Sequence, residues 1–348
     1  MTAAPVTAAD TVATSLPSLA PAAWARLGAH PVPAIEARGL RRTFGTMVAV
    51  DALDLTVERG EIYGFLGPNG AGKSTSVRML CTLLRPTGGR ATVAGFDVVR
   101  DATQVRLRVG VALQEAALDA GQSGRELLEL QARLFALPGS SARRRIAELI
   151  ELVDLGDAID RRVATYSGGM RRRLDLALAL VHEPEVIFLD EPTTGLDPVS
   201  RRQVWTEVRR LNEHEGVTIF LTTQYLEEAD ALAGRVGIIS GGRLVVEGTP
   251  DELKRSVGRD LVVVTIDGEM TPAHEALRAL DLVERCEAMG DELVAAVASG
   301  PAAVPRIASA LDGLPLTIRE ISVRRPSLDD VFLEVTGARI GASAAAVR

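Results

Sequence analysis

The fold of this chain is decided by one stretch, Gly67-Pro68-Asn69-Gly70-Ala71-Gly72-Lys73-Ser74-Thr75. The stretch directly follows an apolar run at 62–66 and directly precedes a segment with helical spacing, so it joins a strand to a helix. Its glycines allow successive backbone N–H groups to turn toward one anion, and the start of the helix adds the positive end of its dipole. The sequence therefore predicts a phosphate-binding loop within an α/β fold.

The last residues of this loop have specific expected contacts with a nucleoside triphosphate. Lys73 is expected to reach the β- and γ-phosphates, Ser74 to offer its hydroxyl to Mg²⁺, and Thr75 to contact the α-phosphate. The alternative is a glycine-rich turn without a ligand, which does not explain why all nine positions fit the motif. A guanine nucleotide is not expected, because the only lysines are Lys73 and Lys254, and a guanine-reading Asn-Lys-x-Asp motif needs another.

A second motif supplies acidic side chains. An apolar strand at 186–189 ends at Asp190, in the arrangement that holds Mg²⁺ in P-loop NTPases. Glu191 follows at once, where a carboxylate can polarise the attacking water as a general base. Two adjacent acids are also compatible with a solvated loop end, but the apolar run before them and the turn at 192–195 favour the catalytic interpretation.

The composition limits the class of protein. At roughly 150 residues per domain, 348 residues suffice for two domains and a tail. The contents of 47% hydrophobic and 24% charged residues are typical of a globular protein and exclude a disordered or fibrous one. The net charge of −7 gives no overall positive field, so no nucleic-acid partner is expected. Cys81 and Cys286 lack the spacing of a metal site or the density of a disulfide scaffold.

The chain is expected to lie in the cytoplasm. Its apolar stretches are far shorter than the roughly 18 to 20 residues that cross a bilayer, and its N-terminus does not resemble a secretory signal.

Composition and pattern divide the chain into a flexible leader at 1–34, an α/β nucleotide-binding domain at 35–250 with a helical subdomain at about 115–165, a small α+β domain at 255–337 and a tail at 338–348.

The small C-terminal domain has its own pattern. Strand and helix signals follow in the order β-α-β-β-α-β, which suggests a ferredoxin-like domain, with a hairpin turn across Gly290 and Asp291. The final helix is expected to begin after Ser327 as its N-cap and to stop at Gly337.

A third motif, Tyr166-Ser167-Gly168-Gly169-Met170, stands between the two phosphate motifs and from composition alone is only the capped start of a helix. Together the three motifs make residues 36–250 resemble the ATP-binding subunit of an ABC transporter. The resemblance implies ATP and Mg²⁺ as ligands, and hydrolysis of the ATP. It also implies a homodimer of head-to-tail cassettes, in which the signature residues of one subunit contact the γ-phosphate held by the other.

The resemblance assigns further residues to the site. Gln114 corresponds to the Q-loop, which senses Mg²⁺ and nucleotide and touches the membrane subunit. Asp197 corresponds to the D-loop, and Phe44 to an aromatic that stacks on adenine, although it could equally belong to the core. The expected catalytic residues are Lys73, Gln114, Glu191 and Gln224, and the expected Mg²⁺ residues are Ser74, Gln114 and Asp190. The expected ATP-binding residues are Phe44, Gly67, Pro68, Asn69, Gly70, Ala71, Gly72, Lys73, Ser74, Thr75, Ser167, Gly168, Gly169 and Asp197.

One position departs from the family pattern, because Gln224 stands where a switch histidine is usual. A glutamine amide can hydrogen-bond a phosphate oxygen or a water but cannot carry a proton. Glu191 is therefore expected to act alone as the base. The substitution predicts slow turnover, or tight ATP-dependent closure with modest hydrolysis.

Gln224 and the closing motif at 326–337 are similar to the daunorubicin-resistance branch of exporter ATPases. This resemblance implies efflux of a drug or natural product through a separately encoded membrane permease, with the chain bound to the cytoplasmic face of the membrane. An ABC protein acting on DNA or the ribosome would need a long heptad insertion or two cassettes, and neither is present. The remaining alternative is an ATP-gated dimeric clamp or regulatory protein with little turnover.

Three arginine clusters are candidate binding surfaces. The clusters at 143–145 and 324–325 are expected to be solvated faces of the protein. The cluster at 171–173 directly follows the signature, and a role in positioning nucleotide charge is a hypothesis for it.

Overall fold

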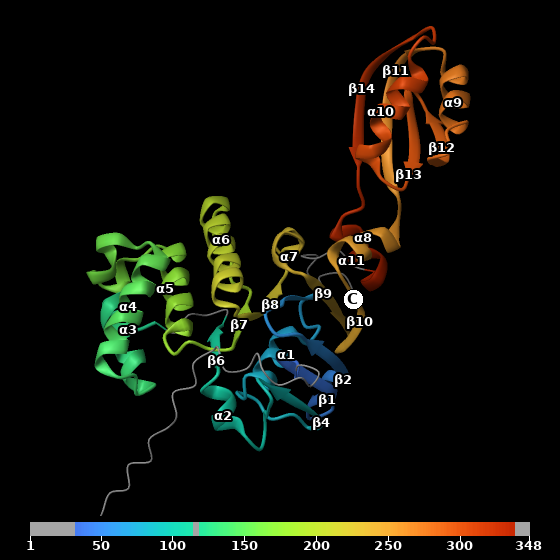
Figure 1. Cartoon of the computed structure of the whole chain (residues 1–348). Coiled ribbons are helices and arrows are strands. Elements are labelled where there is room, and N and C mark those ends of the chain that lie inside the picture. The colour runs from blue at the N-terminus through green and yellow to red at the C-terminus, as the bar shows by residue number, and fades with distance from the viewer. Residues whose placement is uncertain (1–31, 114–117, 338–348) are drawn as a thin grey trace, which may run out of the picture. The chain divides into compact units, whose positions relative to one another are not determined.

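A computed structural model of the chain describes residues 32–113 and 118–337 (Figure 1). The expected leader lies almost wholly outside these residues, as do Gln114 and the expected tail. In the described ranges, no helix has both the length and the apolar character needed to cross a membrane. Cys81 and Cys286 are both buried free thiols.

The central element is a six-stranded sheet in the order β10-β9-β3-β8-β7-β6, with all neighbours parallel except the edge strand β10. Its strands are β3 (Ile62–Leu66), β6 (Val109–Ala112), β7 (Val186–Asp190), β8 (Thr218–Thr223), β9 (Arg235–Ser240) and β10 (Arg243–Gly248). Every residue of β3, β7 and β8 is buried, as expected for strands of a parallel sheet that is covered on both faces.

The two faces of this sheet contribute to different cores. On one face, Ile187 and Ile219 pack with the helices α5 (Gly168–Leu180) and α6 (Pro198–Glu215). On the other face, Phe188 and Phe220 pack with the helix α1 (Lys73–Leu80) and with a second, antiparallel sheet. That sheet has the order β2-β1-β4-β5 and consists of β1 (Ile35–Phe44), β2 (Met47–Val57), β4 (Gly88–Val93) and β5 (Phe96–Asp97). The short helix α2 (Ala102–Arg106) leads from β5 into β6.

Helices occupy the segment between β6 and β7, as the sequence predicts. They are α3 (Gly124–Leu134), α4 (Gly139–Val153), the 3-10 helices η2 (Gly156–Asp160) and η3 (Val163–Thr165), and α5. A capping box between Ser123 and Glu126 starts α3. Leucines at helical spacing from α3, α4 and α5 share one core, and the three helices lie side by side in green in Figure 1.

The C-terminal elements follow in the order β-α-β-β-α-β. They are β11 (Asp260–Gly268), α9 (Met270–Arg278), β12 (Val283–Met289), β13 (Glu292–Val297), α10 (Gly300–Leu311) and β14 (Leu316–Arg324). The antiparallel sheet order β12-β13-β11-β14 is that of a ferredoxin-like fold. Gly290 has a φ of +68°, so the predicted hairpin turn is present between β12 and β13.

The last helix, α11 (Leu328–Thr336), does not belong to the core of that small sheet. Its Leu328, Val331 and Phe332 are buried against α7 (Leu226–Leu232), α8 (Pro250–Val257) and β9. Ser327 and Asp330 form a capping box at its start, and Gly337 caps its end with a φ of +66°, as predicted. The end of the described chain therefore packs on the helix that follows Gln224.

The expectation for the cluster at 143–145 was wrong for one of its members. Arg145 is only 7% exposed, and its guanidinium donates to the carbonyl of Leu180 and pairs with Glu148 and Glu215. It joins α4 to the ends of α5 and α6 because the helical pitch turns position 145 toward the core. Arg143 and Arg144 are exposed.

Candidate functional site

The loop after β3 can be built only with glycine at two of its positions. A Cβ on Gly67 would lie 2.4 Å from the backbone oxygen of Ile239, and one on Gly72 would lie 2.5 Å from that of Ala49. Gly72 also has a φ of +110°, which L side chains rarely adopt. It is the N-cap of α1, so the loop ends at the N-terminus of a helix, as phosphate binding requires.

Lys73 is held at the mouth of this loop. Its Nζ donates to the backbone oxygens of Gly67 at 2.6 Å and Pro68 at 3.3 Å. Burial lowers the pKa of Lys73, while the nearby carboxylates of Glu191 and Asp190 act in the opposite direction. A buried ammonium beside a concave loop of backbone donors fits a polyphosphate.

Asp190 ends β7 directly beside this loop. Ser74 Oγ donates to its Oδ1 at 3.3 Å, and Thr222 Oγ1, at the neighbouring end of β8, donates to the same oxygen at 2.5 Å. A hydroxyl and a carboxylate on facing elements form the oxygen donor set that Mg²⁺ prefers, so these residues fit the predicted metal. Thr222 was not predicted, although its place as a polar residue near the end of a buried strand could have indicated it.

Glu191 turns away from the strand in an unusual backbone conformation. Its φ is +50°, and its N–H donates to Thr222 at 3.0 Å to the carbonyl and 3.2 Å to the hydroxyl. Its carboxylate oxygen Oε2 accepts from Thr194 Oγ1 at 3.1 Å and from Gln224 Nε2 at 3.4 Å. The structure thus brings Glu191 into contact with the residue that replaces the histidine.

Lys73, Ser74, Glu191 and Gln224 line one cavity of about 540 Å³, and Asp190 lies directly beside it. Phe44 lies at its edge, is 41% exposed and carries the Arg42 guanidinium 4.5 Å from the centre of its ring, so it is not a core residue. Met47, Val48 and Ala49 also line the cavity and were not predicted, because nothing in their spacing distinguishes them from an ordinary strand. The complete lining is Phe44, Met47, Val48, Ala49, Pro68, Asn69, Gly70, Gly72, Lys73, Ser74, Thr75, Glu191 and Gln224.

The signature residues lie outside this cavity and form a different surface. Ser167 is the N-cap of α5 and accepts from the N–H of Met170 at 3.2 Å. Asp197 caps α6 in the same way, and its Oδ2 accepts from Ser200 Oγ at 2.6 Å. A Cβ on Gly169 would lie 3.0 Å from Ser200 Oγ, so the signature and the predicted D-loop are in close contact with each other.

Of the three arginines after the signature, Arg172 and Arg173 are engaged by the backbone of their own chain. Arg172 is only 9% exposed and donates to backbone carbonyls at the ends of β6 and β7. Arg173 donates to the carbonyls of Val153 and Asp154 at 2.9 Å each, and Arg171 is exposed. Successive helical residues point about 100° apart, which is why three adjacent arginines have three different environments.

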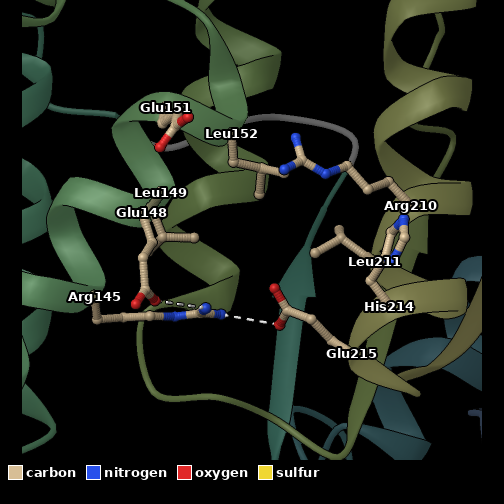
Figure 2. Close-up of a pocket in the computed structure, with 9 residues that line it drawn as sticks. All are labelled: Arg145, Glu148, Leu149, Glu151, Leu152, Arg210, Leu211, His214 and Glu215. Atoms are coloured by element: carbon tan, nitrogen blue, oxygen red, sulfur yellow. Dashed lines mark hydrogen bonds and ion pairs between the residues drawn. The ribbon is translucent and has the colours of Figure 1, made fainter.

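A second cavity of about 310 Å³ lies between α4 and α6 (Figure 2). In Figure 2 the Arg145 guanidinium lies between Glu148 and Glu215, with Leu149 and Leu211 beside it. Arg145, Glu148 and Glu215 already pair with one another, so these three groups are not reserved for a ligand.

A strand, a glycine-rich loop and a helix N-terminus, with two acids at the end of β7 on the far side of β8, define the class of P-loop nucleotide hydrolases. The helical insertion carrying the signature defines the ABC type. The ABC transporter family profile matches residues 50–194, and the profile of the C-terminal domain of DrrA1-3-like ATP-binding proteins matches 248–336. The chain belongs to the ABC transporter ATP-binding proteins, in the branch of the DrrA proteins, and is an ATPase.

Relatives and solved structures agree with this assignment. The chain is 48% identical over 310 residues to daunorubicin resistance ATP-binding protein DrrA2 of Streptomyces coeruleorubidus, covering 88% of this chain and 96% of that protein. It is 46% identical to daunorubicin/doxorubicin resistance ATP-binding protein DrrA of Streptomyces peucetius, covering 89% and 94%. CbiO1 from Clostridium perfringens, part of an ABC transporter complex, matches with a TM-score of 0.59 and 25% identity over 64% of this chain and 90% of that one. A dimeric post-hydrolysis state of the ATP-binding cassette MJ0796, bound to ADP and Pi, has the same fold, with a TM-score of 0.57 and 24% identity over 62% and 98%.

Proposed function

We propose that this chain hydrolyses ATP to drive export of a drug or natural product through a separate integral-membrane permease. It acts as a homodimer of cassettes, bound peripherally at the cytoplasmic face of the membrane. The cargo class rests on the names of its relatives, which are daunorubicin and doxorubicin resistance proteins. Relatives named Nod factor export ATP-binding protein, at 38 to 41% identity, support export as the direction.

The observation that carries the proposal is the single cavity that gathers the phosphate loop, Glu191 and Gln224, with Asp190 directly beside it. In it, Lys73 and the loop N–H groups bind the phosphates and Phe44 stacks on the base. Ser74 and Asp190 hold Mg²⁺, which when bound neutralises phosphate charge. Glu191 accepts the proton of the attacking water, and Gln224 orients that carboxylate.

The position of the signature supports the proposed homodimer. Ser167, Gly168, Gly169 and Asp197 lie outside the cavity of their own chain, so they are available to a nucleotide held by a second copy. Asp197 has a pKa lowered chiefly by the Ser200 hydroxyl, and it is therefore a fixed negative charge at that surface.

The test is ATP hydrolysis and drug transport by the chain with a permease encoded beside it in its genome, reconstituted in inverted vesicles. We expect Mg²⁺-dependent hydrolysis that the permease and doxorubicin stimulate, and uptake of doxorubicin into the vesicles. Lys73→Ala and Glu191→Gln should abolish both. Hydrolysis without ATP-driven uptake of any amphipathic drug tested would contradict the export role.

A second candidate is an ATP-gated clamp with little turnover, which the contact between Gln224 and Glu191 favours because an amide cannot relay a proton. The clamp predicts ATP-dependent dimers, measured by mass, without hydrolysis even in the presence of the permease.

A further inference from the structure

The carbonyl groups on both sides of Glu191 are bound by one buried side chain. Arg172 Nε donates to the oxygen of Pro192 at 2.9 Å, and Arg172 Nη2 donates to the oxygen of Asp190 at 3.2 Å. Arg172 lies on α5, five residues after the signature Ser167. The guanidinium therefore links the signature helix to the carbonyls of the residues before and after the proposed base.

Glu191 needs such support because of its backbone. A φ of +50° is left-handed, and a residue with a Cβ keeps that conformation only where its surroundings hold it. On one side the N–H of Glu191 is bound by Thr222 of β8. On the other side the flanking carbonyls are bound by Arg172, so the conformation is fixed from two elements at once.

The same guanidinium reaches a third element. Its Nη1 donates to the oxygen of Leu113 at 2.6 Å and to the carboxylate of Asp175 at 3.0 Å, and its Nη2 lies 3.5 Å from the oxygen of Ala112. Leu113 is the residue before Gln114 in the sequence. Arg172 thus holds the signature helix in register with the ends of both β6 and β7.

We propose that Arg172 is a positioning residue for ATP hydrolysis, which fixes the backbone conformation of Glu191 and couples it to the signature helix. The proposal rests on the role of Glu191 as base. Arg172 does not line the nucleotide cavity, so it acts through Glu191.

The distinguishing variant is Arg172→Lys. A lysine keeps the charge, but its three donors lie on one nitrogen, whereas the planar guanidinium fork presents five donors to several carbonyls. We expect kcat to fall by roughly 10- to 100-fold, as for a displaced catalytic group, while KM for ATP changes less than about twofold. A matched control is Arg145→Lys, because Arg145 is similarly buried and also donates to a carbonyl, that of Leu180, but does not contact Glu191 or its neighbours. It should lose thermal stability but keep kcat.

A double variant of the full chain completes the test. Glu191→Gly removes the Cβ that disfavours positive φ. It should therefore raise the melting temperature more in the Arg172→Lys background than in the wild type.

The outcomes distinguish the role of Glu191 as base from the positioning role of Arg172. Full turnover by Glu191→Gln overturns the role of Glu191 as base. Wild-type kcat in Arg172→Lys, with Glu191→Gln inactive, overturns the positioning role alone. If Arg172→Lys is too unstable for kinetics, additive effects of the two substitutions on melting temperature overturn the proposal.

Discussion

Gln224 Nε2 donates to the carboxylate of Glu191, with 3.4 Å between the nitrogen and Oε2. The hydroxyl of Thr194 donates to the same oxygen. Two donors on one oxygen leave the other oxygen of Glu191 free of these contacts and fix the plane of the carboxylate. The residue that departs from the family pattern is therefore part of the support of the proposed base.

Removing this amide should slow hydrolysis. We expect Gln224→Ala to lower kcat by about 10-fold, since a hydrogen bond to a charged group contributes roughly 1.5 kcal/mol or more. Steady-state hydrolysis at saturating ATP measures this. Gln224→Glu is the matched variant, because it keeps the shape of the side chain but places a second carboxylate against that of Glu191. The two negative charges repel each other, so this variant should be slower still. Equal kcat for wild type and Gln224→Ala would show that the contact does not serve the reaction.

The close approach of the Ile239 backbone to Gly67 predicts that a side chain at position 67 weakens nucleotide binding. A Cβ there would meet the backbone of Ile239 at 2.4 Å, so Gly67→Ala must displace the phosphate loop. We expect at least a 10-fold weaker ATP affinity by calorimetry. Gly88→Ala is the control, because its Cβ would meet only the Arg41 side chain at 3.5 Å and its φ is not left-handed. Unchanged affinity in Gly67→Ala would contradict the predicted rigidity of the loop.

The packing of α11 predicts a stability effect far from the nucleotide. Phe332 is 1% exposed in a core that includes Leu226 of α7, so Phe332→Ala should lower the free energy of unfolding by about 3 kcal/mol or more. Leu333→Ala is the matched control, because Leu333 is 41% exposed, and it should cost much less. Urea denaturation of the two variants measures the difference. Equal loss in both would show that α11 is not anchored on α7.

The phosphate loop and the acids could be predicted from sequence because their chemistry requires fixed residue types at fixed spacing. Lys73, Asp190 and Glu191 needed only the pattern of a buried strand followed by a turn. The contacts of Thr222 with Asp190 and Glu191 could not be predicted in this way, since they depend on which strands are neighbours. That order, with β8 beside β7, is a long-range property of the sheet.

The environments of two buried arginines also could not be predicted from the sequence. Arg145 and Arg172 stand in runs of three arginines that look equally solvated in the sequence. Their burial depends on helix rotation, and their partners are backbone carbonyls, which carry no signal in the residue types. The sequence locates Gln224 at the position of the usual switch histidine. Its contact with Glu191 could be found only in the folded structure.

His182 predicts how stability depends on pH. Its ring stacks on Phe135 at 3.8 Å between centroids, and its Nε2 lies 3.0 Å from the carbonyl oxygen of Val109. Burial lowers the pKa of His182 to about 4, the hydrogen bond to Val109 opposes this, and the charge of Arg145 adds to the lowering.

Because the native pKa lies below the value of about 6.5 in an unfolded chain, the unfolded state binds the proton first as pH falls. The contribution of His182 is thus fully present above pH 6.5 and is lost between about pH 6.5 and 4, by at most about 1.4 kcal/mol per pH unit. His182→Gln keeps a donor for Val109 without a titrating group, so its urea midpoint should fall less steeply over this range. Asp175, whose pKa burial raises to about 6, titrates in both proteins and cancels in the comparison. Parallel curves for wild type and His182→Gln would show that folding does not shift the pKa of His182.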